Sequence, residues 1–388
     1  IACMSTTMNR RSWLKASALL TGGLTVFNSK WMVAGAAPRI NSCTLTDFEF
    51  ARHAPPTLKA RLFANENPFG PCDKAKQAIK DCLDTCYQYP MQKGEELGQL
   101  LEKKEGVTMD MMMPGGGSSP LLQATALYFA KDGGNVISGD PSYEDIPFWM
   151  EQVGAQWIKV PLTKDYKLNL EAMEKAVNAQ TKLVYICNPN NPTGTTVDTA
   201  ALKDFCERVS KKTTVFVDEA YIDYVDNPKA ASMLDCVKNG QNVIVSRTLS
   251  KLYGFAGLRM GYIIAKPDLI KKIEPYSTTF FTLSAPAIHA AIAGLNDEAY
   301  LQSALQKTNT SKEYLYKQLK GEGYEYIPSQ TNFVMFPLKM EGKRFVDEMM
   351  KRGVGLRDWK LAGKDWCRIS IGRMDEMEAF AEAFKELS

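Results

Sequence analysis

Apolar positions follow two spacings along this chain. Short runs rich in Val and Ile are separated by longer stretches in which apolar residues recur every three or four positions. The first spacing is typical of buried strands and the second of amphipathic helices. Strands that alternate with helices predict a mostly parallel sheet covered by helices on both faces. The predicted strands are residues 135–138, 156–160, 182–186, 214–217 and 242–245, and the helices between them are 142–153, 170–179 and 199–209.

The pattern outside this sheet predicts a smaller second unit. Before the sheet, residues 73–86 and 95–105 have helical spacing, whereas residues 37–70 are polar and irregular. We therefore expect an N-terminal arm (37–70), a large domain (71–283) and a small α+β domain (284–388). In the small domain, helices are expected at residues 286–295, 299–319, 342–351 and 374–384, and strands at 324–327, 332–336 and 367–371.

The first 36 residues have the three regions of an export signal. Arg10 and Arg11 precede an apolar stretch over residues 16–27, and small residues follow at 34–36. Paired arginines before such a stretch resemble the twin-arginine type of signal. We therefore expect an exported, periplasmic protein, with a cytoplasmic location as the alternative. A short amphipathic helix or a membrane anchor would fit the same pattern.

Composition narrows the possible chemistry. The net charge of +3 is close to balance, and no apolar run after the first 36 residues is long enough to span a bilayer, so neither a nucleic-acid nor a membrane partner is expected. The nine cysteines show no repeated spacing, and the chain has only two histidines, His53 and His289. A metal site and Ser-His-Asp catalysis are therefore poorly supported. A lysine is the obvious candidate for general acid–base work.

Residues 114–120 (PGGGSSP) form a glycine-rich loop that leads into an apolar helical stretch. A loop of this kind leaves backbone N–H groups at the start of a helix unpaired, and an anion can bind them. The loop lacks the Gly-Lys-Ser/Thr of a Walker motif and the G-x-G-x-x-G spacing of a dinucleotide fold. An anion site and an ordinary capped helix start both fit this sequence.

Chemically active residues follow four of the predicted strands. Tyr143 comes after the first strand and Asn191 after the third. Asp218 and Tyr221 follow the fourth, and Lys251 follows the fifth. The carboxyl ends of parallel strands meet at one edge of a sheet, where ligands bind. Each residue alone is ordinary in a loop, but together they provide what a pyridine aldehyde phosphate needs.

Three segments resemble the pyridoxal-phosphate aminotransferases of fold type I: residues 188–194 (NPNNPTG), 218–221 (DEAY) and 250–262 (SKLYGFAGLRMGY). Residues 65–70 (NENPFG) and 87–90 (YQYP) are most similar to the histidinol-phosphate aminotransferase branch. The resemblance covers nearly everything after residue 61 in the same order. It implies an α/β fold, with a mostly parallel seven-stranded sheet between helices in the large domain and a smaller α+β domain at the C-terminus.

The resemblance also implies the cofactor and its ligands. Lys251 would bind pyridoxal 5'-phosphate as a Schiff base and move a proton during the transfer. Asp218 would pair with the pyridine nitrogen, and Tyr143 would stack on the ring. Tyr221 and Asn191 would bond the phenolic oxygen, and Lys251, Asp218 and Tyr221 are the implied catalytic residues. The phosphate would be held by Gly117, Ser118, Ser119, Thr248, Ser250 and Arg259.

On the same resemblance, Tyr89 would reach the cofactor phosphate of a neighbouring subunit, which implies a homodimer with shared active sites. Arg368 would bind the substrate carboxylate, with Asn332 close by, because a guanidinium matches a carboxylate at two points. Arg357 would lie near the side-chain end of the substrate. Asn67 is also assigned to substrate binding.

The implied function is transamination by a ping-pong mechanism. An amino group would pass from an amino acid, either histidinol phosphate or an aromatic amino acid, to a 2-oxo acid. A β-lyase or a decarboxylase of a phosphorylated amino acid would use the same scaffold and remains an alternative. A protein that only binds the cofactor or an amine is the alternative from another class.

Overall fold

The computed structural model describes residues 58–277 and 282–387. The chain divides into two units, residues 1–41 and 42–388, and all described residues belong to the second unit. The predicted export signal (1–36) and most of the predicted arm, with His53, therefore lie outside the described residues. Among the residues that are described, no helix combines the length and the apolar character needed to cross a membrane.

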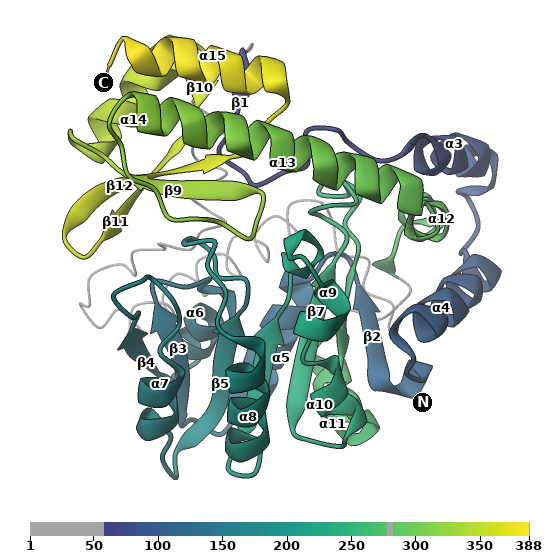
Figure 1. Ribbon diagram of the computed structural model, residues 1–388. Helices are drawn as coiled ribbons and strands as arrows, with labels where there is room; N and C mark the ends of the chain where they lie inside the picture. Colours follow the sequence, from purple (N-terminus) through teal and green to yellow (C-terminus); the bar gives the residue numbers. More distant parts are fainter. Residues whose placement is uncertain (1–57, 278–281, 388) are drawn as a thin grey trace, which may run out of the picture. The chain divides into compact units, whose positions relative to one another are not determined.

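A seven-stranded sheet in the order β2-β8-β7-β6-β5-β3-β4 forms the centre of the large domain (Figure 1). Only β8 runs antiparallel to its neighbours, so the prediction of a mostly parallel sheet is confirmed. The pattern does not indicate β2, because its four residues include Pro and Gly and are too few to show a period. The strands are β2 (Met112–Gly115), β3 (Asn135–Asp140), β4 (Gln156–Pro161), β5 (Thr181–Cys187), β6 (Thr214–Asp218), β7 (Val243–Thr248) and β8 (Gly261–Ile264).

Helices pack against both faces of this sheet, as predicted. Successive residues of β6 show why: Val215 and Val217 belong to one apolar cluster, and Phe216 between them belongs to the other. The first cluster takes in α3 (Asp73–Cys82), α4 (Met91–Glu105), α7 (Leu170–Ala176), α8 (Thr199–Val209), α10 (Leu234–Lys238) and α12 (Ala285–Leu295). The second takes in α5 (Ser119–Ala130), α6 (Asp145–Gln152) and α11 (Pro267–Ile273).

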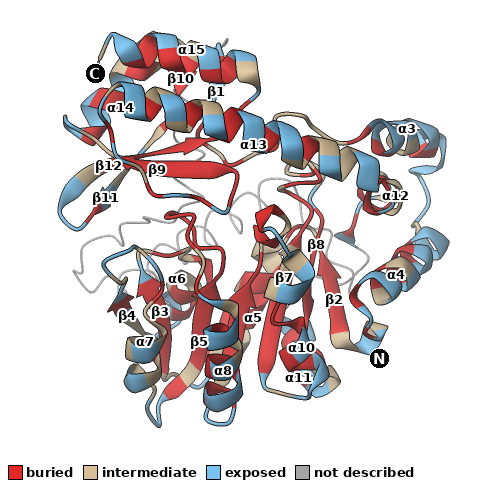
Figure 2. Cartoon of the chain, in the orientation of Figure 1, coloured by how far each residue is buried: buried red, intermediate tan, exposed pale blue. Residues whose placement is uncertain are grey.

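The strands of the main sheet and the helices that cover them differ in how far their residues are buried. Figure 2 shows β5 and β7 buried along most of their length, while α8 and α13 (Glu298–Gly321) alternate buried and exposed residues. Helices with one apolar face cover a sheet in this way. A short helix, α9 (Pro228–Ala231), follows the end of β6.

The C-terminal residues build a second, three-stranded antiparallel sheet in the order β11-β12-β9. Its strands are β9 (Phe333–Pro337), β11 (Arg357–Leu361) and β12 (Lys364–Ser370), and it packs with α14 (Gly342–Lys351) and α15 (Met374–Lys385). The predicted strand at 324–327 is wrong, because only Ile327 pairs with this sheet, through an isolated bridge. Strand β11 has an exposed, polar alternation and was not predicted.

Residues near the start of the described chain also join this second unit. β1 (Ala60–Arg61) pairs in parallel with β10 (Val354–Gly355), and Ala60 and Leu62 lie in the same apolar core as Phe336. The domain boundaries predicted from the sequence stay predictions. The packing nevertheless shows that part of the predicted arm contributes to the core around the C-terminal sheet.

Two features of the fold position the functional site. The carboxyl ends of β5, β6 and β7 lie side by side, which brings together the segments that follow them. The segment after β7 then turns close to the loop before α3. Gly254 has a φ of +75°, and a Cβ atom there would lie 2.4 Å from the carbonyl group of Gly70. Only glycine allows this close approach without strain.

Candidate active site

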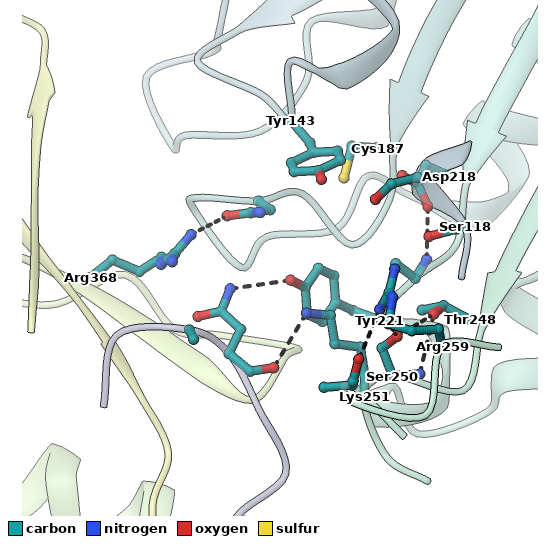
Figure 3. Close-up of a pocket in the computed structure, with 16 residues that line it drawn as sticks. Ser118, Tyr143, Cys187, Asp218, Tyr221, Thr248, Ser250, Lys251, Arg259 and Arg368 are labelled. Carbon is teal, nitrogen blue, oxygen red and sulfur yellow. Dashed lines mark hydrogen bonds between the residues drawn. The ribbon is translucent and has the colours of Figure 1, made fainter. Parts of the chain in front are cut away.

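A pocket of about 160 Å³ lies where the ends of the main-sheet strands face β12. Figure 3 shows Arg368 entering from the C-terminal sheet, on the opposite side from Lys251, Ser250 and Thr248. Tyr143 lies on a third side. Most residues predicted to bind the cofactor therefore line one pocket, although they come from segments far apart in the chain.

Lys251 and Tyr221 form the centre of the pocket. The Lys251 Nζ donates a hydrogen bond to the backbone oxygen of Asn65 at 3.3 Å and lies 5.2 Å from the centroid of the Tyr221 ring. Tyr221 is buried, and its hydroxyl oxygen accepts a hydrogen bond from Asn65 Nδ2 at 3.1 Å. Asn65 therefore holds both the amine and the phenol in place.

Asp218, the last residue of β6, is a buried carboxylate with three donors. Ser246 Oγ donates to Oδ1 at 2.7 Å, the Ala220 amide donates to Oδ1 at 3.1 Å, and Tyr185 Oη donates to Oδ2 at 2.9 Å. Burial raises the pKa of Asp218, while these donors and the nearby charge of Lys251 lower it. The donors fix the direction of the carboxylate, which can then pair with a cationic N–H group.

One end of the pocket carries donors that suit an anion. Ser118 and Ser119 lie at the start of α5, and Thr248 and Ser250 line the same pocket. Arg259 Nη1 reaches Ser250 Oγ at 3.4 Å. Hydroxyl groups, a guanidinium and the free N–H groups of a helix start are the donors that phosphate prefers.

Gly117 makes room for this arrangement. Its φ is +92°, and a Cβ atom built on it would lie 2.1 Å from Arg259 Nη2. The missing side chain thus leaves the space that the guanidinium occupies. Gly117 itself does not line the pocket, so its predicted phosphate contact through the backbone stays a prediction.

Arg368 on β12 closes the pocket from the other side. Only 2% of its surface is exposed. Its Nη1 donates to Asn191 Oδ1 at 2.8 Å, and its Nη2 donates to the backbone oxygen of Phe63 at 3.0 Å. The bond to Arg368 uses the amide oxygen of Asn191, so the amide nitrogen of Asn191 is the atom that can donate to a ligand.

Two aromatic rings hold the Arg368 guanidinium. Its Cζ lies 5.5 Å from the ring centroid of Phe333 and 5.6 Å from that of Trp359. These distances are within the range of a cation–π contact. The guanidinium of Arg357, directly across the strand pair, lies 5.3 Å from the same Trp359 ring.

Besides Gly117, four residues predicted for the site do not line the pocket. Asn332 Nδ2 donates to the backbone oxygens of Asn65 and Glu66 at 3.1 and 3.2 Å. Asn67 Nδ2 donates to the backbone oxygen of Leu252 at 2.6 Å. These four, Asn332, Asn67, Arg357 and Tyr89, keep their predicted ligand contacts only as predictions.

The structure adds residues that the sequence analysis did not single out. Asn65 contacts both Tyr221 and Lys251, Tyr185 and Ser246 hold Asp218, and Asp145 accepts a hydrogen bond from Tyr143 Oη at 3.2 Å. Asn65 belongs to the motif at residues 65–70, so this motif was the signal that could have indicated it. Its φ of +53° is a conformation that asparagine adopts more readily than most residues. Tyr185 and Asp145 lie inside a predicted strand and a predicted helix, and Ser246 directly follows the predicted strand at 242–245.

The residues present fit the cofactor implied by the sequence. Its phosphate would face the hydroxyl and arginine donors, its pyridine nitrogen would face the oriented carboxylate of Asp218, and Lys251 supplies the amine between them. The space left by Gly117 beside Arg259 is part of the same cradle. Asp218 is the only acidic side chain in the described lining, and the protonated pyridine nitrogen of such a ligand would pair with it.

Comparison with known proteins gives the same answer. The family model for aminotransferase class I and II matches residues 59–384. The histidinol-phosphate aminotransferase of Moorella thermoacetica is 35% identical over 329 residues, which cover 84% of this chain and 85% of the relative. Histidinol-phosphate aminotransferase 2 of Carboxydothermus hydrogenoformans is also 35% identical, over 84% of this chain and 90% of the relative.

Solved structures agree with this assignment. The structure of histidinol-phosphate aminotransferase from Sinorhizobium meliloti in complex with pyridoxal-5'-phosphate has a TM-score of 0.80 at 25% identity, over 91% of this chain and 100% of that one. A putative histidinol-phosphate aminotransferase from Erwinia carotovora atroseptica has a TM-score of 0.81 at 28% identity, over 85% and 97%. The predicted family, fold and cofactor are thus confirmed. The chain belongs to the class I and II aminotransferases, enzymes of fold type I that depend on pyridoxal 5'-phosphate.

Proposed function

We propose that this aminotransferase takes its amino group from histidinol phosphate and passes it to a 2-oxo acid. The observation that carries the proposal is the convergence of Lys251, Asp218 and the hydroxyl–arginine donors in one pocket. The choice of amino donor is supported by two relatives named histidinol-phosphate aminotransferase, which are 35% identical over 84% of this chain.

When bound, pyridoxal 5'-phosphate supplies an electron sink that stabilises negative charge at the α-carbon of the substrate. Asp218 supports this by holding a proton on the pyridine nitrogen. Its three donors keep the carboxylate oriented. A cationic N–H partner lowers the pKa of a buried carboxylate, so the pair stays ionised.

Lys251 has two roles in the proposal. Its Nζ would hold the cofactor covalently, and as a free amine it would accept the proton that leaves the α-carbon of the substrate. The Asn65 carbonyl oxygen, 3.3 Å from Nζ, keeps the amine on the substrate side of the pocket. Tyr221 Oη, fixed by Asn65 Nδ2, donates to the phenolic oxygen of the cofactor.

The remaining residues bind and orient. Ser118, Ser119 and Arg259 hold the phosphate group of the cofactor, with Thr248 and Ser250. Arg368 binds the carboxylate of the 2-oxo acid at two points, because its guanidinium is planar and already held by two rings. Arg357 and Asn332 extend this binding toward the other end of the substrate, and Asn67 holds the loop that carries Lys251 through the Leu252 carbonyl.

A homodimer is part of the proposal. Four large apolar side chains lie exposed within one short segment, with exposed fractions of 58% for Leu83, 83% for Tyr87, 78% for Tyr89 and 55% for Met91. Exposed apolar side chains grouped in this way mark surfaces that bind another protein. A second copy would cover them and bring its Tyr89 to the neighbouring phosphate site.

Export of the protein, directed by residues 1–36, is the last part of the proposal.

The test is a transfer assay with purified protein, pyridoxal 5'-phosphate, histidinol phosphate and 2-oxoglutarate. We expect glutamate to form only when both substrates are present, and Lys251→Ala protein to form none. Keto product in excess of the enzyme's active sites, formed without any acceptor, would contradict transamination. Separate incubations test the alternatives: pyruvate with ammonia from a sulfur-containing amino acid would indicate a β-lyase, and carbon dioxide from a phosphorylated amino acid a decarboxylase. Saturable cofactor binding without any product would indicate a binding protein.

A further inference from the structure

Asp145 is a buried carboxylate directly behind two walls of the pocket. It is the first residue of α6, and only 8% of its surface is exposed. Its Oδ2 accepts a hydrogen bond from Tyr143 Oη at 3.2 Å, and the side chain of Ser119 lies near enough to lower the pKa of the carboxyl group. Tyr143 and Ser119 line the pocket, whereas Asp145 does not.

These two contacts join elements that are otherwise separate in the chain. Tyr143 belongs to the loop between β3 and α6, and Ser119 is the first residue of α5. The first supplies the aromatic face of the pocket and the second supplies donors at the phosphate end. One carboxylate therefore contacts both the ring wall and the anion wall.

A charge in this position is unfavourable for the protein without ligand. The pKa of Asp145 is raised from 3.8 to about 6, mainly by burial and also by the negative charge of Asp218 at the end of β6. The hydroxyls of Tyr143 and Ser119 act in the opposite direction. An apolar residue of similar volume would fill the same space without this cost, so the carboxylate needs another explanation than packing.

We propose that Asp145 is a positioning residue for the cofactor, whose carboxylate fixes Tyr143 and Ser119 relative to each other before the cofactor binds. This rests on the proposed function, because it concerns the same pocket. A tyrosine whose hydroxyl is anchored keeps one rotamer, and a serine held at a helix start keeps its donors directed at the ligand. A site arranged in advance loses less conformational entropy on binding.

The test compares two variants that differ in the property at issue. Asp145→Asn keeps an acceptor oxygen in the same place without the charge. Asp145→Leu is apolar and somewhat larger, and it offers no acceptor. For each protein, freed of cofactor, the dissociation constant of pyridoxal 5'-phosphate is measured by quenching of tryptophan fluorescence at pH 8, and the melting temperature is measured without cofactor.

We expect Asp145→Leu to weaken cofactor binding about tenfold, the effect of losing one hydrogen bond to a charged acceptor. Asp145→Asn should stay within about threefold of the wild type. The Asp145→Leu protein without cofactor should melt no lower than the wild type, because the substitution removes a buried charge. Weaker binding without lost stability distinguishes positioning from a structural role.

A double-mutant cycle with Tyr143→Phe keeps the proposal testable if Asp145→Leu does not fold. Tyr143→Phe retains the ring and removes the donor to Asp145. In the Asp145→Asn background, Tyr143→Phe should weaken cofactor binding as much as it does in the wild type, because the amide oxygen still accepts the hydrogen bond. An effect of Tyr143→Phe that nearly vanishes in this background would show that only the charged acceptor holds the tyrosine.

Three results would decide against the proposal. Asp145→Leu protein that binds cofactor as tightly as the wild type would overturn it, and so would equal weakening by Asn and Leu. A Tyr143→Phe protein with unchanged cofactor affinity would do the same. If the wild type itself failed to bind pyridoxal 5'-phosphate, the proposed function would fall instead, so the two failures are distinguishable.

Discussion

The two sides of the pocket are built by different means. The cofactor wall consists of Ser118, Tyr143, Asp218, Lys251 and Arg259. These residues follow strands of one sheet or lie at a helix start, and hydrogen bonds among neighbours hold several of them. The substrate wall consists of Asn65 and Arg368, with Phe333 and Trp359 behind the guanidinium.

The substrate wall depends on packing between segments that are distant in the chain. Arg368 contacts the backbone of Phe63, the amide of Asn191 and two aromatic rings. Its position is therefore set by tertiary contacts rather than by a local motif. The difference suggests that changes in the cofactor wall abolish the chemistry, whereas changes in the substrate wall alter substrate affinity and leave the cofactor bound.

The largest effect is expected at the centre of the cofactor wall. Lys251→Ala should reduce the transfer rate by at least about 10³-fold, because it removes both the covalent anchor and the general base. Lys251→Arg is the matched control: it keeps the positive charge but cannot act as an amine nucleophile, and should be equally inactive. Steady-state kinetics on folded protein measure this. A variant with more than a tenth of wild-type activity would contradict the role of Lys251.

A smaller but selective effect is expected in the substrate wall. Arg368→Lys should lower kcat/KM for the 2-oxo acid about 100-fold, since a single ammonium cannot bind a carboxylate at two points. The dissociation constant of the cofactor should change less than about threefold, within the tolerance for distant sites. A loss of cofactor binding comparable to the loss of activity would show that the two walls are not independent.

Asp145→Asn should change stability in a way that depends on pH. The pKa of Asp145 is raised to about 6 in the folded protein, so its proton binds more tightly there than in the unfolded chain. The stability that this proton contributes is fully present below about pH 4 and is lost as the pH rises through 6. The variant, which has no charge to bury, should therefore match the wild type near pH 4.

At pH 8 the free energy of unfolding of the same variant should exceed that of the wild type by up to about 3 kcal/mol, which corresponds to a shift of about two pKa units. Urea unfolding of cofactor-free protein at pH 4.5 and pH 8 measures the difference. A gain that is the same at both values of pH would rule out the raised pKa as its cause.

The smallest effect is expected at Trp359, which lies between the guanidiniums of Arg357 and Arg368. Trp359→Leu should raise KM for the 2-oxo acid about threefold, the value of one exposed cation–π contact. Trp359→Phe retains a ring and should stay closer to the wild type. Should kcat fall while KM stays constant, the ring would have another role than holding Arg368.

The same contrast explains what could be predicted from the sequence. The cofactor wall could be predicted because Asp218 ends one buried apolar strand and Lys251 lies three residues after the end of another, and parallel strands end at one edge. The seven-stranded sheet and its helices on both faces follow from the same alternation. Asp145 was missed because it lies inside a predicted helix, where an acidic residue in the first turn is unremarkable.

The substrate wall is less readable for a physical reason. Asn65 and Ser370 are joined by a hydrogen bond of 2.7 Å across 305 positions of the chain, and no periodic pattern reports such a contact. For the same reason, the short strand β11 was not predicted and the strand predicted at 324–327 does not form. Tertiary packing decides whether such short segments pair. Residue types and a resemblance indicated Arg368, but its aromatic support emerged only from the fold.

The most direct test of the account is to identify the residue that holds the cofactor. Protein loaded with pyridoxal 5'-phosphate is treated with borohydride, which makes the bond to an amine permanent, then digested and analysed by mass spectrometry. The account predicts that the phosphopyridoxyl group is found on Lys251, and that Lys251→Ala protein treated in the same way carries none. A label on another lysine of the wild type, or none at all, would contradict it.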